Sequence, residues 1–187
     1  WFGGTMAGPA IADVLFGDYN PGGKLVQTWP LSMEQLPPMM DYNIRDGRTY
    51  MYFKGEPLFP FGYGLSYTTF SFSNFRTSNN IVKNGSVVKV NVDVMNSGKR
   101  TGDEVVQLYI RHLNSSVTRP QKELKAFQRI TLKPGEKKMV SLELKANDLK
   151  YWDIDKKKFV FETDKVELML GSSSTDIKFY RTMDTVQ

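Results

Sequence analysis

The stretch Val88-Lys89-Val90-Asn91-Val92-Asp93-Val94 decides the fold class of this 187-residue chain. Four valines occupy every second position, and Lys, Asn and Asp fill the positions between them. Successive side chains of a strand point to opposite faces of a sheet, so this alternation predicts a half-buried β-strand. A strand of this kind needs a second apolar layer to cover its valine face.

The residues on both sides of this stretch repeat the β pattern. Phe70, Phe72 and Phe75 mark a strand before it, and a turn at 96–99 precedes a further strand at 104–110. More strands are predicted at 127–132, 139–144, 158–161, 166–170 and 177–180. About seven strands separated by short turns are typical of a β-sandwich of the immunoglobulin or fibronectin type III class. We therefore expect a mainly β fold, with this sandwich over residues 70–187.

Residues 1–30 follow a different pattern, that of a helix and then a strand. Pro9 suits a first helical turn, the apolar residues at 10–15 recur on one helical face, and Gly17 supplies a stop. A turn-rich segment at 18–23 leads to a strand predicted at 25–29. One helix and one strand cannot bury both of their faces, so we interpret this segment as the remnant of an α/β domain. The aromatic start without an initiator Met favours a cut inside a longer protein.

Residues 31–69 form a predicted connecting loop that is long for a compact domain. Its aromatic and basic side chains suit either a sugar site or packing between two domains, and we favour packing. They are Tyr42, Arg48, Tyr50, Tyr52, Phe53, Phe59, Phe61 and Tyr63.

Composition excludes several classes of chemistry. The chain has no Cys and one His, so disulfides and thiol nucleophiles are absent, and we expect neither a metal site nor a cofactor. No apolar run reaches the roughly 20 residues of a membrane span. Residues 71–187 carry 21 basic and 14 acidic side chains, a net charge of +7. The lysines are dispersed among strands and turns, which favours a solvated surface and protected sheet edges over nucleic-acid binding.

Three short motifs are interpreted as structural. The segment at 62–67 begins like a dinucleotide fingerprint but lacks the third Gly and the following helix. Asp153-Ile154-Asp155 begins like a calcium loop, yet Lys157 stands at a ligand position, so we predict a charged turn. The sequence has no Gly-x-Ser-x-Gly motif whose serine His112 could activate, so His112 is predicted to be a surface histidine.

Several blocks in order resemble the C-terminal region of glycoside hydrolase family three, the β-glucosidases and β-xylosidases. The segment at 10–25 is similar to the end of that family's α/β-sandwich domain, and 47–50 with 60–68 is similar to its connecting segment. The segment at 102–109, followed by 119–120 and 122–127, resembles its fibronectin type III-like module. The resemblance covers nearly the whole chain.

The resemblance implies a retaining hydrolase with an Asp nucleophile on a barrel domain and a Glu acid/base on the α/β-sandwich domain. Both are expected upstream of Trp1, so no catalytic residue is assigned here. We expect the chain alone to be inactive, as the structural or accessory C-terminal part of an exo-acting enzyme. Its partners would be the upstream catalytic domains and, through them, an oligosaccharide. The resemblance also implies that the longer enzyme is periplasmic or secreted.

The loop around 41–52 is the segment expected nearest the substrate, with Tyr42, Arg48 and Tyr50 as candidate contacts. The segment 46–52 leans toward xylosidase-like relatives, and the choice between glucoside and xyloside stays open. An alternative is a non-catalytic carbohydrate-binding module, for which Tyr109, Tyr151 and Trp152 are the candidate exposed aromatics. A second alternative is a binder of nucleic acid or of polysaccharide anions that uses the +7 charge of residues 71–187.

Overall fold

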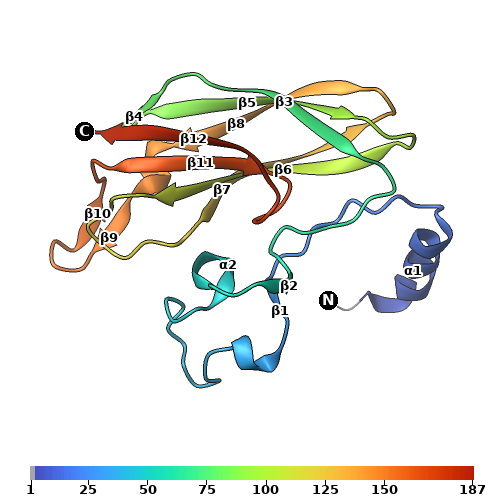
Figure 1. The fold of residues 1–187 in the computed structure, drawn as a ribbon, viewed down its shortest axis with the longest axis horizontal. Helices are drawn as coiled ribbons and strands as arrows, with labels where there is room; N and C mark the ends of the chain where they lie inside the picture. The colour runs from blue at the N-terminus through green and yellow to red at the C-terminus, as the bar shows by residue number, and fades with distance from the viewer. Residues whose placement is uncertain (1–2) are drawn as a thin grey trace.

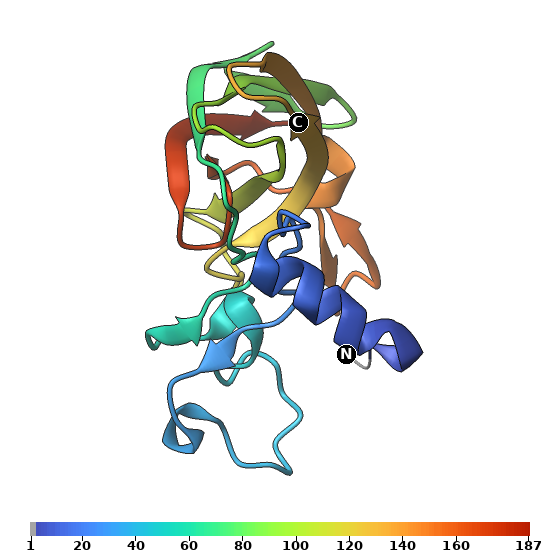
Figure 2. The same cartoon turned by 90° about the vertical axis from the view of Figure 1, so that its right-hand side faces the viewer.

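The computed structural model describes residues 3–187, which form two regions (Figure 1). Residues 70–187 build a β-sandwich, and residues 3–69 lie against one side of it. Figure 2 shows the same arrangement after a quarter turn, with the N-terminal region below the sandwich. The predicted mainly β fold is confirmed.

The sandwich consists of two sheets and one separate hairpin. The five-stranded sheet has the order β4 (Ile81–Lys83), β12 (Ile177–Val186), β11 (Lys165–Gly171), β6 (Gly102–His112) and β7 (Glu123–Leu132). The three-stranded sheet has the order β3 (Phe70–Thr77), β5 (Val87–Asn96) and β8 (Lys137–Lys145). A 3-10 helix, Ala146–Leu149, leads from β8 to the hairpin of β9 (Tyr151–Asp153) and β10 (Lys158–Val160). Neighbouring strands are antiparallel except β4 and β12.

The valine ladder of β5 is the centre of the core, as its alternation predicts. Val88, Val90, Val92 and Val94 are fully buried. They belong to one cluster with apolar residues of the other sheet, including Leu108 of β6. At roughly 25 cal/mol per Å² of buried apolar surface, this layer is the main source of stability of the sandwich.

Strand β6 departs from the simple alternation, because both of its faces are buried in the middle. Val106, Leu108 and Ile110 face the core, while Gln107 and Tyr109 on the other face are buried as well. An outer face of a sandwich is normally solvated, so something must cover it. The cover is the N-terminal region.

The predicted helix of that region is present as α1 (Ala7–Phe16), preceded by a 3-10 helix at Gly4–Met6. It ends where expected, because Gly17 has a φ of 85° and its N–H bonds to the carbonyl of Val14. None of its residues is buried, and Leu15 and Phe16 are 72% and 85% exposed. None of the helices among the described residues is long and apolar enough to cross a membrane.

The strand predicted at 25–29 is wrong for most of its length. Only β1 (Trp29–Pro30) is a strand, paired with β2 (Pro57–Phe59). Leu25 instead exchanges hydrogen bonds with the connector, donating to the carbonyl of Tyr63 and accepting from the N–H of Gly62. A β-prone segment becomes a strand only where a neighbouring strand offers a ladder, and residues 3–69 offer little more than β2.

The segment predicted as a long loop contains two short helical turns. A 3-10 helix spans Met33–Gln35, and α2 spans Thr49–Tyr52. Apart from these turns and β2, the backbone is irregular, and the part between β1 and α2 hangs below the sandwich (Figure 1).

Candidate functional site

The site begins at the aromatic contact between the connector and β6. The ring of Tyr50 stacks on Phe61 with centroids 4.2 Å apart, and it meets the ring of Tyr109 edge-on at 6.0 Å. The hydroxyl of Tyr50 accepts a hydrogen bond of 3.0 Å from the N–H of Leu124. Burial raises the pKa of both tyrosines. Tyr109 is therefore part of the packed interior, and its predicted role as an exposed aromatic is wrong.

Buried hydrogen bonds reinforce this contact. The amide of Gln107 donates to the carbonyls of Gly62 and Ser172, at 3.3 and 2.6 Å, and its oxygen accepts from the hydroxyl of Tyr109. The N–H of Ser174 donates to the carbonyl of Phe61 at 2.9 Å. Unmade hydrogen bonds in such a place are costly, so the connector is held in one position on the sandwich.

Beyond the contact, the loop that carries the candidate residues is braced by Arg48. Its Nε donates to the carbonyl of Asp41 at 2.6 Å, and its Nη2 donates to the carbonyl of Pro38 at 2.8 Å. The same guanidinium therefore fixes two points of the loop at 38–48. Tyr42 projects from this loop and is 80% exposed.

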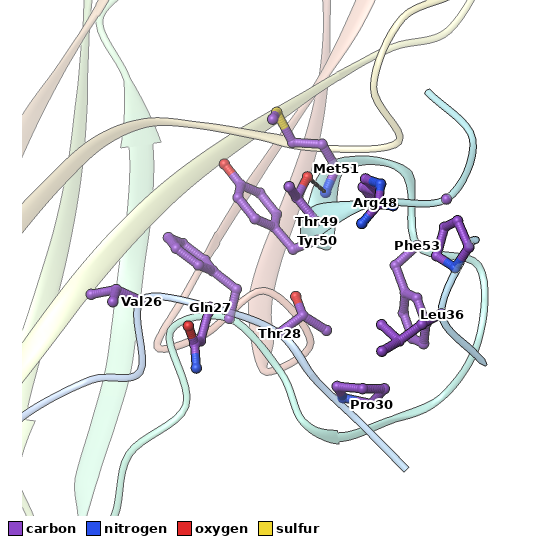
Figure 3. Close-up of a pocket in the computed structure, with 13 residues that line it drawn as sticks. Val26, Gln27, Thr28, Pro30, Leu36, Arg48, Thr49, Tyr50, Met51 and Phe53 are labelled. Atoms are coloured by element: carbon purple, nitrogen blue, oxygen red, sulfur yellow. Dashed lines mark hydrogen bonds between the residues drawn. The ribbon is translucent and has the colours of Figure 1, made fainter. Parts of the chain in front are cut away.

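A cavity of about 400 Å³ lies beside the brace (Figure 3). Its walls are mainly apolar, with a few polar groups: Val26, Gln27, Thr28, Pro30, Leu36, Pro37, Gly47, Arg48, Thr49, Tyr50, Met51, Phe53 and Phe61. The buried Oγ1 of Thr28 has no hydrogen-bond partner within residues 3–187. An apolar cavity with a few converging polar groups is the usual form of a small-ligand site.

Strained backbone marks the rim of this cavity. Thr49, which follows Arg48, has a φ of 59°, a value that a β-branched residue rarely adopts. Gly47, two residues earlier, has a φ of 93°. Such strain persists only where the surroundings impose it, and it is concentrated at functional sites.

The three candidate contacts predicted from the sequence thus have different positions. Arg48 and Tyr50 both line the cavity, and each is also held by protein groups. Tyr42 lies outside the lining residues and is open to solvent. The structure brings together Arg48 and Tyr50 and leaves Tyr42 apart.

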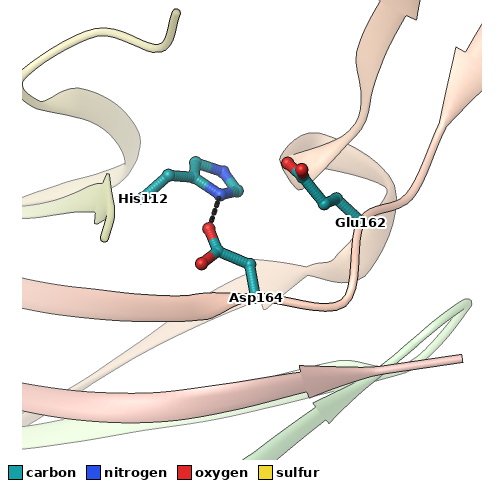
Figure 4. Close-up of side chains that lie close together, drawn as sticks. All are labelled: His112, Glu162 and Asp164. Carbon is teal, nitrogen blue, oxygen red and sulfur yellow. Dashed lines mark hydrogen bonds and ion pairs between the residues drawn. The ribbon is translucent and has the colours of Figure 1, made fainter. Parts of the chain in front are cut away.

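The predicted surface position of His112 is wrong. Its side chain is 2% exposed, and its Nδ1 lies 2.9 Å from Oδ2 of the buried Asp164 (Figure 4). Nη2 of Arg119 lies 2.5 Å from its Nε2. Burial and the charge of Arg119 lower the pKa of His112, against the opposing effects of Asp164 and Glu123. The imidazole is therefore neutral at pH 7, with its proton on Nδ1.

His112, Glu162 and Asp164 place three possible metal-ligand atoms within 4.8 Å of one another, a grouping that the residue count did not predict. The acceptor atoms of all three side chains already receive hydrogen bonds from protein groups. Asp164 accepts from the N–H groups of Asn114 and Lys165 as well as from His112. The carboxylate of Glu162 accepts bonds from two serines, at 2.6 Å each. With a guanidinium against the imidazole, this donor set suits an internal hydrogen-bond network better than a cation.

The other two candidate aromatics of a carbohydrate module lie on the β9–β10 hairpin. Tyr151 is partly buried, with the guanidinium of Arg119 over its ring at 5.3 Å. Trp152 is exposed. The turn that follows is the predicted charged turn, in which the N–H and Nζ of Lys156 both bond to the carboxylate of Asp153.

Comparison with known proteins accounts for both regions. Residues 1–67 match the glycosyl hydrolase family 3 C-terminal domain, and residues 104–174 match the fibronectin type III-like domain. A periplasmic beta-glucosidase of Salmonella typhimurium is 43% identical over 95% of this chain and 25% of its own length. A beta-xylosidase of Formosa agariphila is 44% identical over 93% of this chain and 24% of its own length.

Solved structures agree with these matches. The beta-D-glucoside glucohydrolase of Trichoderma reesei superposes with a TM-score of 0.87 and 31% identity, over 98% of this chain and 29% of its own. A beta-glucosidase of Kluyveromyces marxianus in complex with glucose gives 0.86 and 37%, over 96% of this chain and 23% of its own. The chain spans about a quarter of the length of the curated relatives it matches. It belongs to glycoside hydrolase family 3, as the C-terminal part of that family's enzymes with its fibronectin type III-like domain.

Proposed function

We propose that this chain is the accessory C-terminal part of a retaining, exo-acting β-glucosidase or β-xylosidase, in which it fixes the 38–48 loop beside the substrate site. The observation that carries the proposal is that residues 3–69 are bound to the sandwich on one side and expose apolar residues on the other. On one side they are locked to the sandwich through Tyr50, Phe61 and Gln107. On the other side they present apolar surface that needs a partner.

That apolar surface is largest on α1. Ile11, Leu15 and Phe16 are exposed on this short helix, and so is Met6 directly before it. Several large apolar side chains exposed on one short helix mark a protein interface more often than a solvated face. We assign it to the upstream catalytic domains of the same polypeptide.

The chemistry belongs to those upstream domains in this proposal. A retaining hydrolase needs two carboxyl groups about 5–5.5 Å apart across the scissile bond. Three carboxyl groups of this chain that are not exposed are engaged in other contacts: Asp164 with His112, Glu162 with Ser115, and Asp103 with Arg129. The domain limits at residues 30 and 69 remain predictions.

Within the loop, the three candidates have distinct proposed roles. Tyr42 is the group free to contact a sugar, since an aromatic face suits the apolar face of a pyranose. Arg48 acts through the loop, because two of its donor nitrogens bond to backbone carbonyls. Tyr50 anchors the loop to the sandwich.

Since one relative is described as periplasmic, we also propose an exported enzyme.

The experiment is hydrolysis of nitrophenyl β-glucoside and β-xyloside by this chain and, in parallel, by the longer enzyme. We expect turnover only by the longer enzyme. The substrate that it hydrolyses faster identifies it as a β-glucosidase or a β-xylosidase. In the longer enzyme, Tyr42→Ala should raise KM, whereas the matched Tyr180→Ala on β12, also an exposed tyrosine, should not. Turnover by the 187-residue chain alone would refute the upstream placement of the carboxylates. An unchanged KM for Tyr42→Ala would remove the loop from the substrate site.

A further inference from the structure

The β9–β10 hairpin carries a pair of exposed aromatic rings. Trp152 and Phe159 are directly opposite each other in the ladder, so both side chains lie on the same face. Their centroids are 5.2 Å apart with the rings near perpendicular, and the side chains are 52% and 65% exposed. Among residues 3–187, this is the only contacting aromatic pair in which both rings are more than half exposed.

The hairpin is anchored at its base by contacts of Arg119, although it belongs to neither sheet (Figure 1). Arg119 lies over the ring of Tyr151 at 5.3 Å and donates to the carbonyl of Leu149 at 2.5 Å. The same guanidinium contacts His112 in the buried network. A surface whose base is fixed in this way loses little conformational entropy when it binds a ligand.

The charge around the two rings is positive. Residues 150–158 contain four lysines and two aspartates. Lys156 is paired with Asp153 at 2.9 Å. Within the described residues Lys150 and Lys157 form no ion pair, and neither does Asp155. Lys158 is adjacent to Phe159 in the strand, so its side chain lies on the opposite face of the hairpin. An aromatic platform beside unpaired ammonium groups is complementary to a ligand with apolar faces and negative charges.

We propose that this hairpin is a binding site for an acidic polysaccharide, a chain of pyranose rings bearing uronic-acid carboxylates. Pyranose faces pack on Trp152 and Phe159, and the carboxylates pair with Lys150 and Lys157. Membership of a glycoside hydrolase family favours a glycan over a nucleic acid, the other polyanion whose rings stack on aromatic side chains. The site is separate from the loop at 38–48 and brings no catalytic group.

The test is native affinity electrophoresis of the 187-residue chain in gels containing glucuronic-acid-substituted xylan, unsubstituted xylan or DNA. We expect retardation by the acidic xylan alone, weakened by 0.5 M salt. Trp152→Ala and Phe159→Ala should each weaken it about tenfold, which corresponds to one lost aromatic contact. The double charge reversal K150E/K157E should abolish it.

Matched controls separate the site from general effects of charge and hydrophobicity. Phe127→Ala removes an equally exposed ring on β7, and Lys138→Glu reverses an exposed charge on β8; neither should change the retardation. Circular dichroism verifies the fold of each variant. Absence of retardation, equal retardation by the neutral xylan or by DNA, or full retardation of Trp152→Ala overturns the proposal. Retardation of this chain but not of the longer enzyme also overturns it, since the face would then be an interdomain contact.

Discussion

The two regions of the chain use apolar residues in opposite ways. The sandwich places its valines and leucines in a closed core between two sheets, where most are fully buried. The N-terminal region has comparable apolar side chains on α1, and none of that helix is buried. Burial, and not apolar content, is what stabilises a fold. The sandwich can therefore fold from its own contacts, whereas residues 3–69 depend on the sandwich and on a further partner.

The largest test of this contrast compares one leucine from each region. Leu108→Ala in the core should destabilise the chain by about 3 kcal/mol, since it removes buried methyl groups and leaves a cavity. Leu15→Ala on α1 makes the same chemical change on an exposed side chain and should cost less than about 0.5 kcal/mol. Urea unfolding measures both values. Equal costs would contradict the contrast.

Sequence periodicity predicted the self-contained region well and the dependent region poorly. The valine ladder of β5 needs only a covering layer, so its period of two was enough to identify it. The burial of Gln107 and Tyr109 follows from a connector more than forty residues earlier in the chain, which no local pattern records. His112 was misplaced for the same reason, because its partner Asp164 reaches it only through the pairing of β6 with β11.

The candidate loop was identified by its aromatic and basic residues, but their roles depend on three-dimensional contacts. Nothing in the sequence separates Arg48, which bonds to two carbonyls, from Tyr42, which contacts solvent. The strained Thr49 was equally invisible, since a β-branched residue gives no signal of a positive φ.

A smaller effect is expected at the contact that joins the two regions. Tyr50→Ala removes the stacking on Phe61, the edge contact with Tyr109 and the hydrogen-bond acceptor for Leu124. The free energy of local unfolding of the connector should therefore fall by about 2 kcal/mol. The melting of the sandwich should change little. Tyr50→Phe removes only the acceptor and should cost about 1 kcal/mol.

Hydrogen exchange of residues 31–63 measures this local release, with Tyr42→Ala as the control. If Tyr50→Ala instead unfolds the sandwich, the two regions form a single cooperative unit, and the proposed division into a self-sufficient and a dependent region fails.

A pH titration probes the buried network at the end of the sandwich. Because the pKa of His112 is lower in the folded chain than its ordinary 6.5, the unfolded chain binds the proton first as the pH falls. The stability contribution of neutral His112 is therefore fully present above pH 6.5 and is lost as the pH falls toward the folded-state pKa. The groups facing the imidazole are Arg119, Asp164, Glu162 and Glu123.

The melting temperature should fall between pH 7.5 and 5 in the wild-type chain. His112→Gln should be less stable at pH 7.5 but nearly independent of pH across this range, because His112 is the only histidine. The pKa values of Glu162 and Asp176 are lowered from the ordinary carboxyl values of 4.5 and 3.8, so these groups titrate below this pH range. A wild-type melting temperature that stays constant from pH 7.5 to 5 would contradict the buried, neutral imidazole.

The smallest effects are expected from two ion pairs, one between the regions and one within the sandwich. Lys24 pairs with Glu104 at 2.8 Å, and both side chains are largely buried. Lys24→Met leaves the Glu104 carboxylate without its partner and should cost roughly 1–2 kcal/mol. Arg111 pairs with Glu167 at the same distance, but its side chain is half exposed, so Arg111→Met should cost less than about 0.5 kcal/mol.

Salt separates these two ion pairs further. Raising the ionic strength to 1 M shortens the screening length to about 3 Å, which weakens the exposed pair much more than the buried one. The cost of Lys24→Met, measured by urea unfolding, should therefore persist in 1 M salt, while that of Arg111→Met should vanish. Loss of both costs would mean that water reaches Glu104, and that the N-terminal region lies less tightly on β6 than its hydrogen bonds indicate.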